Sequence, residues 1–434
     1  MNSAFSAEDD IVQTEAVEVI GVTPTHGVGL PESVIPYNIQ SSTDADLQRT
    51  QSLDLTDYMK RNLGSLIVND AQNNPLQPDI QFRGFTASPL LGLPQGLSIY
   101  QNSVRVNEVL GDTINWDIIP ESSIASINLI GGANPLFGLN TLGGAISITT
   151  KNGFTHPGHS LEIYGGSFER IVTTAESGAN NGRWGYYGTI SYFDEDGWRD
   201  ASESDALNLF TSFSFRDGTT TSLDLNFNYA DTNLIGNQAS PAELLSRDRD
   251  AVFTSPDITE NSLLFVDLEG QHWLNDLTLL SGNIFYRAND TDSFGGDGTE
   301  FELCNAPNAT LLCEEDDLTT PIEDQNGNTI VGDLDGDGES DLNAINNISQ
   351  RDQRNFGGSF QTTFLHNIFN RGNQFIAGAA YSQGFAEFFS NVEIASLNTD
   401  RRTLGTGLFV PDEGTFIDTQ TRSWSFYMTD TISI

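Results

Sequence analysis

Alternating carboxylates between Asp333 and Asp341 are the residues of this 434-residue sequence whose spacing best fits metal chemistry. The segment reads DLDGDGESD, so acidic side chains recur at every second position, with a glycine at the sixth place. Oxygen ligands with this spacing can converge on one Ca²⁺ ion. The sequence therefore predicts a calcium site whose candidate ligands are Asp333, Asp335, Asp337, Glu339 and Asp341.

The rest of the pattern leaves a second interpretation open. The twelfth place of such a calcium loop should be a bidentate Glu, but it is Ala344, so Asp324 or Asn326 would have to substitute. Segment 291–350 also carries 15 acidic residues and no Lys or Arg, which is equally typical of a solvated acidic loop. Calcium in the 324–341 loop is the one cofactor that we consider, and we expect none to be required.

The two cysteines of the chain, Cys304 and Cys313, lie nine residues apart in the same polar segment. Two thiols so close in a loop fit a small disulfide, which would place the segment in an oxidising compartment or outside the cell. The alternative is a pair of inert thiols. Zinc is not expected, because no further Cys and no close His pair accompany them.

The histidines do not form a catalytic pattern. None of the five occurs in the context of a triad, a zinc site or a phosphate-binding loop. We therefore expect no enzyme activity. The five residues are His26, His156, His159, His272 and His366.

The composition favours a β-rich protein with an acidic surface. Gly occurs 41 times and Phe 27 times, and 60 acidic residues oppose 19 Lys plus Arg, for a formal charge of -41. So few cations argue against nucleic acid as a partner. No apolar run reaches the roughly 18 residues of a membrane-spanning helix, so a membrane location would require a β-barrel.

The region from residue 160 onward predicts strands joined by alternately short and long connections. Short turns fall near Asn181, Asp217, Asn275 and Arg371, and most of the other connections are long. This alternation is the layout of an outer-membrane barrel. The predicted strands are 160–168, 170–179, 183–194, 205–216, 219–231, 259–272, 276–289, 352–365, 373–388 and 419–434.

Within these strands the apolar and polar residues alternate. In segment 221–229, Leu223 and Phe227 share one face, and Asp224 and Asn226 share the other. A soluble sandwich has the same pattern, so the alternation by itself does not identify the solvent on each side.

A Gly-rich segment, SIASINLIGGANPLFGLNTLGGAISITTKNG, runs from Ser123 to Gly153 and precedes this region. It predicts two strands around a connection that contains the Phe137-Gly138 pair and the double glycine Gly143-Gly144, and it ends in Thr150-Lys151. This ordered set resembles the C-terminal end of the plug domain of TonB-dependent outer-membrane receptors. The resemblance extends upstream to Arg83-Gly84 and to segment 98–104, where Asn102-Ser103 replaces the usual Asp-Gly.

The resemblance implies an N-terminal α+β plug domain followed by a transmembrane antiparallel β-barrel. We expect a flexible leader over residues 1–15, the plug over 16–153 and the barrel over 154–434. Helix signals at 53–64 and strand signals at 33–40, 65–68, 80–83, 97–101, 126–130 and 145–150 fit such a plug.

The number of predicted strands is too small to surround a folded domain. Barrels of about 8 strands are filled by their own side chains, whereas plugged lumens occur at about 22 strands. We therefore expect an incomplete barrel, with about 10 of about 22 strands in this chain, and a longer complete protein.

Near the N-terminus, a short β-prone stretch lies in polar surroundings. Such a strand can be captured at the sheet edge of another protein. In the family it corresponds to the TonB box, and the alternative is the first strand of the plug. The predicted box is Glu18, Val19, Ile20, Gly21 and Val22.

Two plug connections, 85–95 and 107–116, combine turn residues with apolar side chains. By the resemblance they are the outward apices that meet ligand, and the alternative is packing against the barrel wall. Arg83, by the same match, is expected in a buried ion pair. The candidate ligand residues are Phe85, Thr86, Ser88, Leu90, Leu91, Gln95, Asp112, Asn115 and Trp116.

Together these predictions describe an active importer in the outer membrane of a Gram-negative bacterium. The resemblance implies an extracellular small-molecule ligand, by family default a ferric siderophore, and energy from TonB with its inner-membrane complex. Outer-membrane lipid would surround the barrel. The alternative is a passive porin or a cation-binding surface adhesin built on a barrel.

Overall fold

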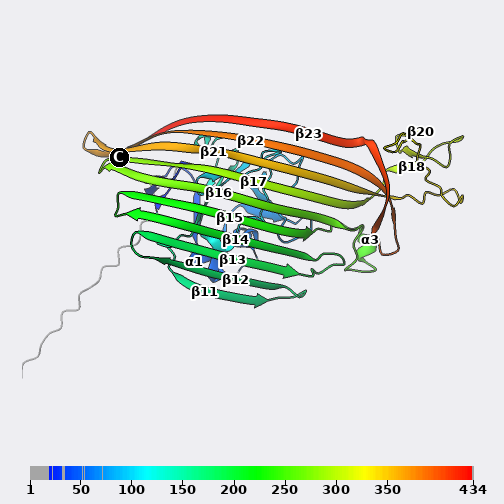
Figure 1. Ribbon diagram of the computed structural model, residues 1–434, viewed down its shortest axis with the longest axis horizontal. Helices are drawn as coiled ribbons and strands as arrows, with labels where there is room; N and C mark the ends of the chain where they lie inside the picture. The colour runs from blue at the N-terminus through cyan, green and yellow to red at the C-terminus, as the bar shows by residue number, and fades with distance from the viewer. Residues whose placement is uncertain are drawn as a thin grey trace, which may run out of the picture.

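A computed structural model describes residues 19–21, 23–31, 35–50, 52, 54–70 and 72–432. The described chain contains a compact N-terminal unit and a large curved sheet, and the unit lies against the concave side of the sheet (Figure 1). In this part of the chain, no helix has the length and apolar character of a membrane span.

The N-terminal unit is an α+β domain, as predicted. Its main sheet has the order β3-β9-β10-β7-β8, and a smaller sheet has the order β4-β5-β6. The elements are β1 Val19–Ile20, β2 Leu30–Pro31, β3 Ile39–Thr43, α1 Asp44–Thr50, α2 Leu55–Asn62, β4 Leu66–Asn69, β5 Asp79–Phe82, β6 Phe85–Ala87, β7 Leu97–Gln101, β8 Val104–Arg105, η2 Glu121–Ser123, β9 Ile124–Gly131, η3 Pro135–Phe137 and β10 Gly144–Thr150.

Helix α2 follows from local sequence signals. The Asp54 carboxylate accepts hydrogen bonds from the Thr56 and Asp57 backbone N–H groups, which caps the helix, and Lys60 and Arg61 lie in its last turn. The structure thus confirms the helix predicted within 53–64. The predicted strand at 33–40 is wrong in position, because the strand begins at Ile39 and continues to Thr43.

The turn between β7 and β8 shows how Asn102-Ser103 replaces Asp-Gly. Both residues have positive φ angles, 49° and 69°, as the two central residues of a type I′ hairpin turn require. Asn102 tolerates this backbone, and its side chain is fixed by hydrogen bonds with the Thr150 hydroxyl and backbone N–H. The substitution therefore keeps a tight hairpin.

The large sheet contains ten antiparallel strands in sequence order, which confirms the ten predicted strands. Among the described residues, β11 and β23 form its two edges. The strands are β11 Gly158–Gly165, β12 Ile171–Asn180, β13 Trp184–Glu195, β14 Ser204–Asp217, β15 Thr221–Ile235, β16 Asp257–Asn275, β17 Thr278–Gly298, β21 Ala344–Ile368, β22 Arg371–Leu397 and β23 Thr403–Ile432.

Short turns and long connections lie at opposite ends of this sheet. In Figure 1 the turns are at the left, and the long connections with α3 (Ala242–Leu245), β18 (Phe301–Leu303) and β20 (Asp317–Pro321) are at the right. We call these the turn end and the loop end. The loop predicted over 290–351 is too long, because β17 continues to Gly298 and β21 already begins at Ala344.

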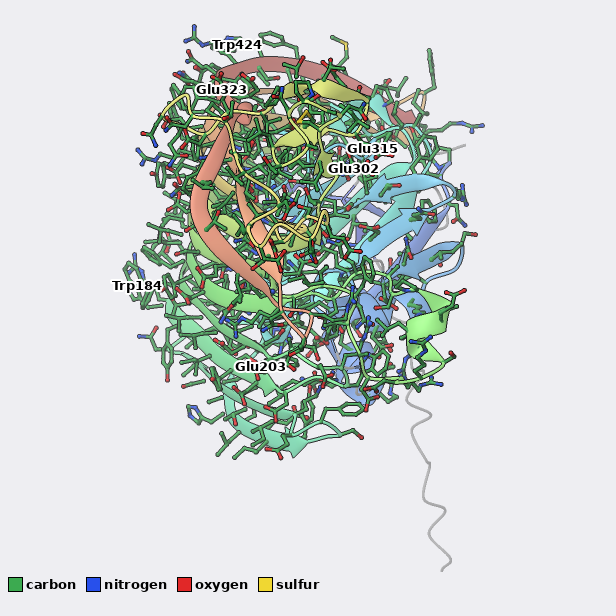
Figure 2. All side chains as sticks on the ribbon, turned by 90° about the vertical axis from the view of Figure 1, so that its right-hand side faces the viewer. Trp184, Glu203, Glu302, Glu315, Glu323 and Trp424 are labelled. Carbon is green, nitrogen blue, oxygen red and sulfur yellow. A yellow bond between two sulfur atoms is a disulfide. The ribbon has the colours of Figure 1, made fainter. Side chains whose placement is uncertain are left out.

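The two faces of the sheet have opposite polarity. On β15, Phe227 is 38 % exposed on the convex face, whereas Asn226 and Asn228 are 2 % exposed on the face toward the plug. Figure 2 shows Trp184 and Trp424 on the convex side as well. Polar side chains inside and apolar ones outside are the arrangement of a membrane barrel and the reverse of a soluble sandwich.

Candidate functional site

The predicted apical loops lie together at the loop end. Strand β11 begins near the turn end, where Gly158 pairs with Gly178, so β10, which precedes it, runs toward that end. Strand β7 pairs with β10 in parallel, so the loops that enter both strands lie at the opposite end. Backbone hydrogen bonds from Gly96 N–H to Thr86 C=O, from Leu142 N–H to Gly96 C=O and from Ile114 N–H to Ser88 C=O join the three loops.

Phe85 lies at the centre of this apical cluster. A Cβ atom added to Gly143 would stand 2.5 Å from the Phe85 side chain, and one added to Gly96 would stand 2.8 Å from it. Only glycine leaves room for the ring at these positions. In the double glycine, Gly143 is therefore explained by the close approach of Phe85, and Gly144 by the Ile130 carbonyl oxygen, which would lie 2.4 Å from an added Cβ atom.

The candidate ligand residues divide into exposed and buried groups. Phe85 and Leu91 are exposed at the apex, and Thr86 and Leu90 are half-buried. Asp112 is held by Arg105 at 2.9 Å and by Asn140 at 2.9 Å. The apex also exposes three apolar side chains that were not predicted as ligand residues: Leu93, Leu139 and Leu142.

Four of the candidates are buried and cannot meet a ligand from outside in this structure. The Ser88 hydroxyl donates to Asp79, and its backbone N–H donates to the Gln95 side chain, so both residues hold the loop itself. Asn115 faces Asn261 of the wall, and Trp116 borders a cavity between plug and wall. Asn115 and Trp116 thus lie between plug and wall in this structure, and their role as ligand residues stays a prediction.

A buried ion pair fastens the plug to the wall. The Glu108 carboxylate is fully buried and accepts two hydrogen bonds from the Arg287 guanidinium, at 2.7 Å and 2.8 Å. Asn289 donates a third at 3.1 Å, and Leu110 N–H donates to the Gln353 side chain at 2.9 Å. Sequence reasoning missed this network, because its members are 179 to 243 residues apart in the chain.

Arg83 does not have the expected role. It is exposed, its guanidinium donates to the Asn38 side chain at 3.2 Å, and it lies over the Phe82 ring. The structure gives it no ion pair among the described residues. The buried pair between plug and wall is the one of Glu108 with Arg287.

A second carboxylate anchors the plug beside the first. Asp117 accepts hydrogen bonds from Thr232 at 2.7 Å and from Asn261 at 2.8 Å, both on the wall. Burial raises the pKa of the Asp117 carboxyl, and the two hydrogen bonds oppose that effect. Plug and wall are therefore joined by satisfied polar groups as well as by apolar contacts.

A cavity of about 540 Å³ separates the plug from strands β11 to β14. Its lining includes Asp54, Glu121, Lys151 and Glu176. Burial, followed by repulsion from Asp54, raises the pKa of the Glu121 carboxyl to about 8. This interface is thus less tightly packed and more acidic than the one around Glu108.

The N-terminal segment is bound to the wall near its turn end. Thr25 donates to Ser359 at 2.8 Å and accepts from Tyr427 at 3.1 Å, and the His26 ring contacts Glu269 at 3.1 Å. Burial opposes the charged form of His26, but the attraction of Glu269 leaves the pKa of the imidazole raised.

The predicted TonB box immediately precedes this bound segment. Glu18 and Val22 lie outside the described residues. Val19 and Ile20 form β1, which pairs with Leu30–Pro31, so part of the stretch is a strand in this structure. The box therefore stays a prediction.

The acidic carboxylates at the loop end converge only in part. Single oxygens of Asp333, Asp335 and Asp341 lie within 4.8 Å of one another, whereas Asp337 and Glu339 are outside this group. Asp324 accepts from the Asn326 and Asn328 backbone N–H groups, and these bonds lower the pKa of its carboxyl. Calcium binding stays a prediction that rests on three carboxylates.

The segment around them is folded. Cys304 and Cys313 form a disulfide with an S–S distance of 2.07 Å. Strands β18, β19 (Leu312–Glu314) and β20 form a sheet, and Leu312, Ile322 and Ile330 share a core with Ile394 and Val410 of β22 and β23. We call residues 299–343 the outer subdomain.

Comparison with known proteins agrees with this architecture. Residues 31–145 match the family model described as "TonB-dependent Receptor Plug Domain". No curated protein matches the sequence.

Solved structures with the same fold include three receptors. Pseudomonas aeruginosa FpvA bound to pyoverdine matches with a TM-score of 0.66 and 14 % identity over 96 % of this chain and 53 % of its own. The ferric citrate transporter FecA matches with a TM-score of 0.66 and 12 % identity, over 92 % of this chain and 54 % of its own. BauA, the ferric preacinetobactin receptor from Acinetobacter baumannii, matches with a TM-score of 0.65 and 13 % identity, over 93 % of this chain and 56 % of its own.

The chain spans about half the length of these structures. Its plug matches a family model, and the strands that follow have the fold of the matched receptors, with a polar inner face and an apolar outer face. Residues 31–145 are therefore a TonB-dependent receptor plug domain, and the chain as a whole has the fold of the outer-membrane receptors that it matches.

Proposed function

We propose that this receptor imports an extracellular small molecule through a plugged barrel. The observation that carries the proposal is the plug itself, which lies against the inner face of the wall and is fastened there by the buried Glu108–Arg287 pair. Such a lumen does not conduct until the plug moves, so transport requires a gating step. A passive porin would need no such domain.

The exposed part of the apical cluster is the proposed first contact for cargo. Phe85 and Leu91, with the neighbouring Leu139 and Leu142, offer apolar surface at the loop end, and Asp112 adds a carboxylate held in place by Arg105. The matched structures carry the names of ferric citrate, pyoverdine and preacinetobactin receptors, which supports a ferric siderophore as the cargo class.

The proposed energy source is TonB with its inner-membrane complex, acting on residues 18–22. The attachment of Thr25 and His26 near the turn end supports this role, because it places the start of the described chain on the side opposite the cargo loops. A barrel of about 22 strands is the proposed complete form.

Deletion of Glu18 to Val22 in the protein as its gene encodes it tests the energy coupling. We expect uptake of radiolabelled iron complexes to vanish while surface display and binding of the complex persist. The matched control removes five residues from the leader before Ala16 and should transport normally. Uptake that continues after deletion of the box would favour the passive porin, and display without any uptake by the parent would favour the adhesin.

A further inference from the structure

Four Lys and Arg side chains are buried in the described part of the chain, and one of them has no partner. Lys151 forms an ion pair with a carboxylate of β12, and Arg287 forms one with Glu108 of the plug. Arg199 donates to backbone carbonyl groups of the long connection between β15 and β16. Arg351 on β21 is only 6 % exposed, yet its guanidinium makes no hydrogen bond and no ion pair with any described residue, and its Nη1 is sealed from solvent.

The side chains next to Arg351 on the inner face do not supply a partner. Its register partners are Thr291 on β17 and Phe388 on β22. The Thr291 hydroxyl is uncharged and donates to Asn261, and Phe388 has no polar side-chain atom. Both neighbours in the sheet therefore leave the guanidinium charge unbalanced.

The carboxylates at this level of the sheet point to the opposite face. Asp352 follows Arg351 directly, and successive side chains of a strand point to opposite faces. Asp290 and Glu387 are the register partners of Asp352, so they share its face. None of these three carboxylates can reach Arg351 from the convex side of the wall.

Glu108 attracts Arg351 but is already engaged by other donors. Its two oxygens accept hydrogen bonds from the Arg287 guanidinium and from Asn289. Asp117, the other carboxylate that anchors the plug, accepts its hydrogen bonds from β15 and β16 and does not act on Arg351. Around Glu108, two buried guanidinium charges therefore face one carboxylate. A water molecule accepts a hydrogen bond but leaves such a charge unbalanced, whereas an anion does both.

A second donor without a partner lies beside the first. Gln353 is two residues from Arg351 on β21, so the two side chains share a face and start about 7 Å apart. The Gln353 side-chain oxygen accepts the Leu110 N–H of the plug at 2.9 Å, which fixes the amide orientation and leaves Nε2 as a donor with no acceptor. Gln353 is 2 % exposed. Two buried donors, one of them charged, thus lie next to each other at the contact between plug and wall.

We infer that Arg351 and Gln353 bind a small monovalent anion, of the size of chloride, between the plug and the wall. The ion balances the second guanidinium beside Glu108 and so strengthens the attachment of the plug. Because both donors are buried, a single ion can occupy the site and a cargo molecule cannot. The inference does not depend on the cargo or on energy coupling.

Stability measurements in two salts test this inference on the purified protein as its gene encodes it. The urea concentration at which the plug becomes sensitive to protease is measured in sodium chloride and in sodium gluconate of equal ionic strength, because gluconate is too large for an enclosed site. We expect chloride to stabilise the plug. Above the Kd for chloride, a tenfold rise in its concentration should raise the folding equilibrium constant of the plug about tenfold, because one ion binds the folded form alone.

Two variants should abolish the response to chloride for different reasons. Arg351→Met removes the charge that holds the ion. Gln353→Glu keeps an oxygen for the Leu110 N–H and places a carboxylate beside Arg351, so the protein then supplies the anion itself. The second variant should therefore be as stable in gluconate as in chloride.

Arg354→Met is the matched control, because Arg354 is exposed and lies on the opposite face of the same strand. It should respond to chloride like the parent. A circular dichroism spectrum checks that each variant is folded, and Gln353→Glu decides if Arg351→Met does not fold. Equal stability of the parent in the two salts, or a response to chloride that persists in Gln353→Glu, would overturn the inference.

Discussion

The two faces of the wall differ in which side chains they bury: the inner face buries polar ones, and the outer face exposes apolar ones. On β17, Arg287 and Asn289 point inward and are buried against the plug. The residues that alternate with this series point outward, and among them Ile284 and Tyr286 are exposed. The inner face contacts a protein domain, and some of its polar side chains pair with groups of that domain, such as Arg287 with Glu108 and Asn261 with Asp117. The outer face contacts lipid, so its apolar side chains remain exposed to solvent in an isolated chain.

One substitution should weaken the contact between the plug and the inner face of the wall. Glu108→Gln leaves the Arg287 guanidinium buried without a counter-charge, and loss of one partner from a buried pair typically costs about 3 to 5 kcal/mol. We expect the plug to become sensitive to protease at a lower urea concentration than in the parent, measured on the purified receptor. The exposed Glu302→Gln should shift stability by less than about 0.5 kcal/mol.

A double variant sharpens this test. Glu108→Gln with Arg287→Met removes both charges of the pair, so part of the lost stability should return. The return should be incomplete, because Glu108 also attracts the buried Arg351 guanidinium. A double variant that is no more stable than Glu108→Gln alone would mean that the ion pair is not the fastening element.

The outer face should respond to charge in a depth-dependent way. Ile284 is 62 % exposed on the outer face of β17, away from the turn end, so Ile284→Arg would place a guanidinium in the middle of the lipid band. Such a charge costs about 2 to 4 kcal/mol at the midplane and about 0 to 1 near an interface. Leu274→Arg, next to a short turn, is the matched control. Equal losses of folding efficiency into vesicles for the two variants would contradict a lipid-facing band at this height.

The sequence predicts the strands well because alternation and turn residues are local signals. The prediction of 183–194 corresponds to Trp184–Glu195, and the prediction of 97–101 is identical to β7. Helix α1 was missed because DADLQRT is short and mostly polar. Strands β21 to β23 continue past the predicted ends because, beyond the membrane, pairing persists in segments whose polar composition indicates a loop.

The site is less accessible to prediction than the strands. The loops that form the apex could be named from turn residues and family resemblance, but which side chains remain exposed depends on how the loops pack. The sequence predicts Ser88 and Phe85 equally as ligand residues, yet Ser88 is fully buried and Phe85 is exposed. Likewise, Glu108 has a partner only because β17 places Arg287 opposite it, and this register joins segments that are distant in the chain.

The predicted calcium loop lies at the loop end, away from both the plug contact and the apolar band of the outer face. Because Ala344 occupies the place of the bidentate Glu, we expect a weak site, with a Kd of about 10⁻⁴ to 10⁻³ M. Calcium should then protect the outer subdomain from protease, and Asp335→Asn should raise the calcium concentration needed by about tenfold, since it removes one of the three converging carboxylates.

Asp337→Asn is the matched control for this smallest effect, because Asp337 has the same charge and a neighbouring position but lies outside the converging group. It should leave the calcium response nearly unchanged, whereas a general effect of acidity would weaken both variants alike. If calcium does not protect the parent protein at all, the acids of the outer subdomain are a solvated surface, and the spacing from Asp333 to Asp341 does not reflect calcium binding.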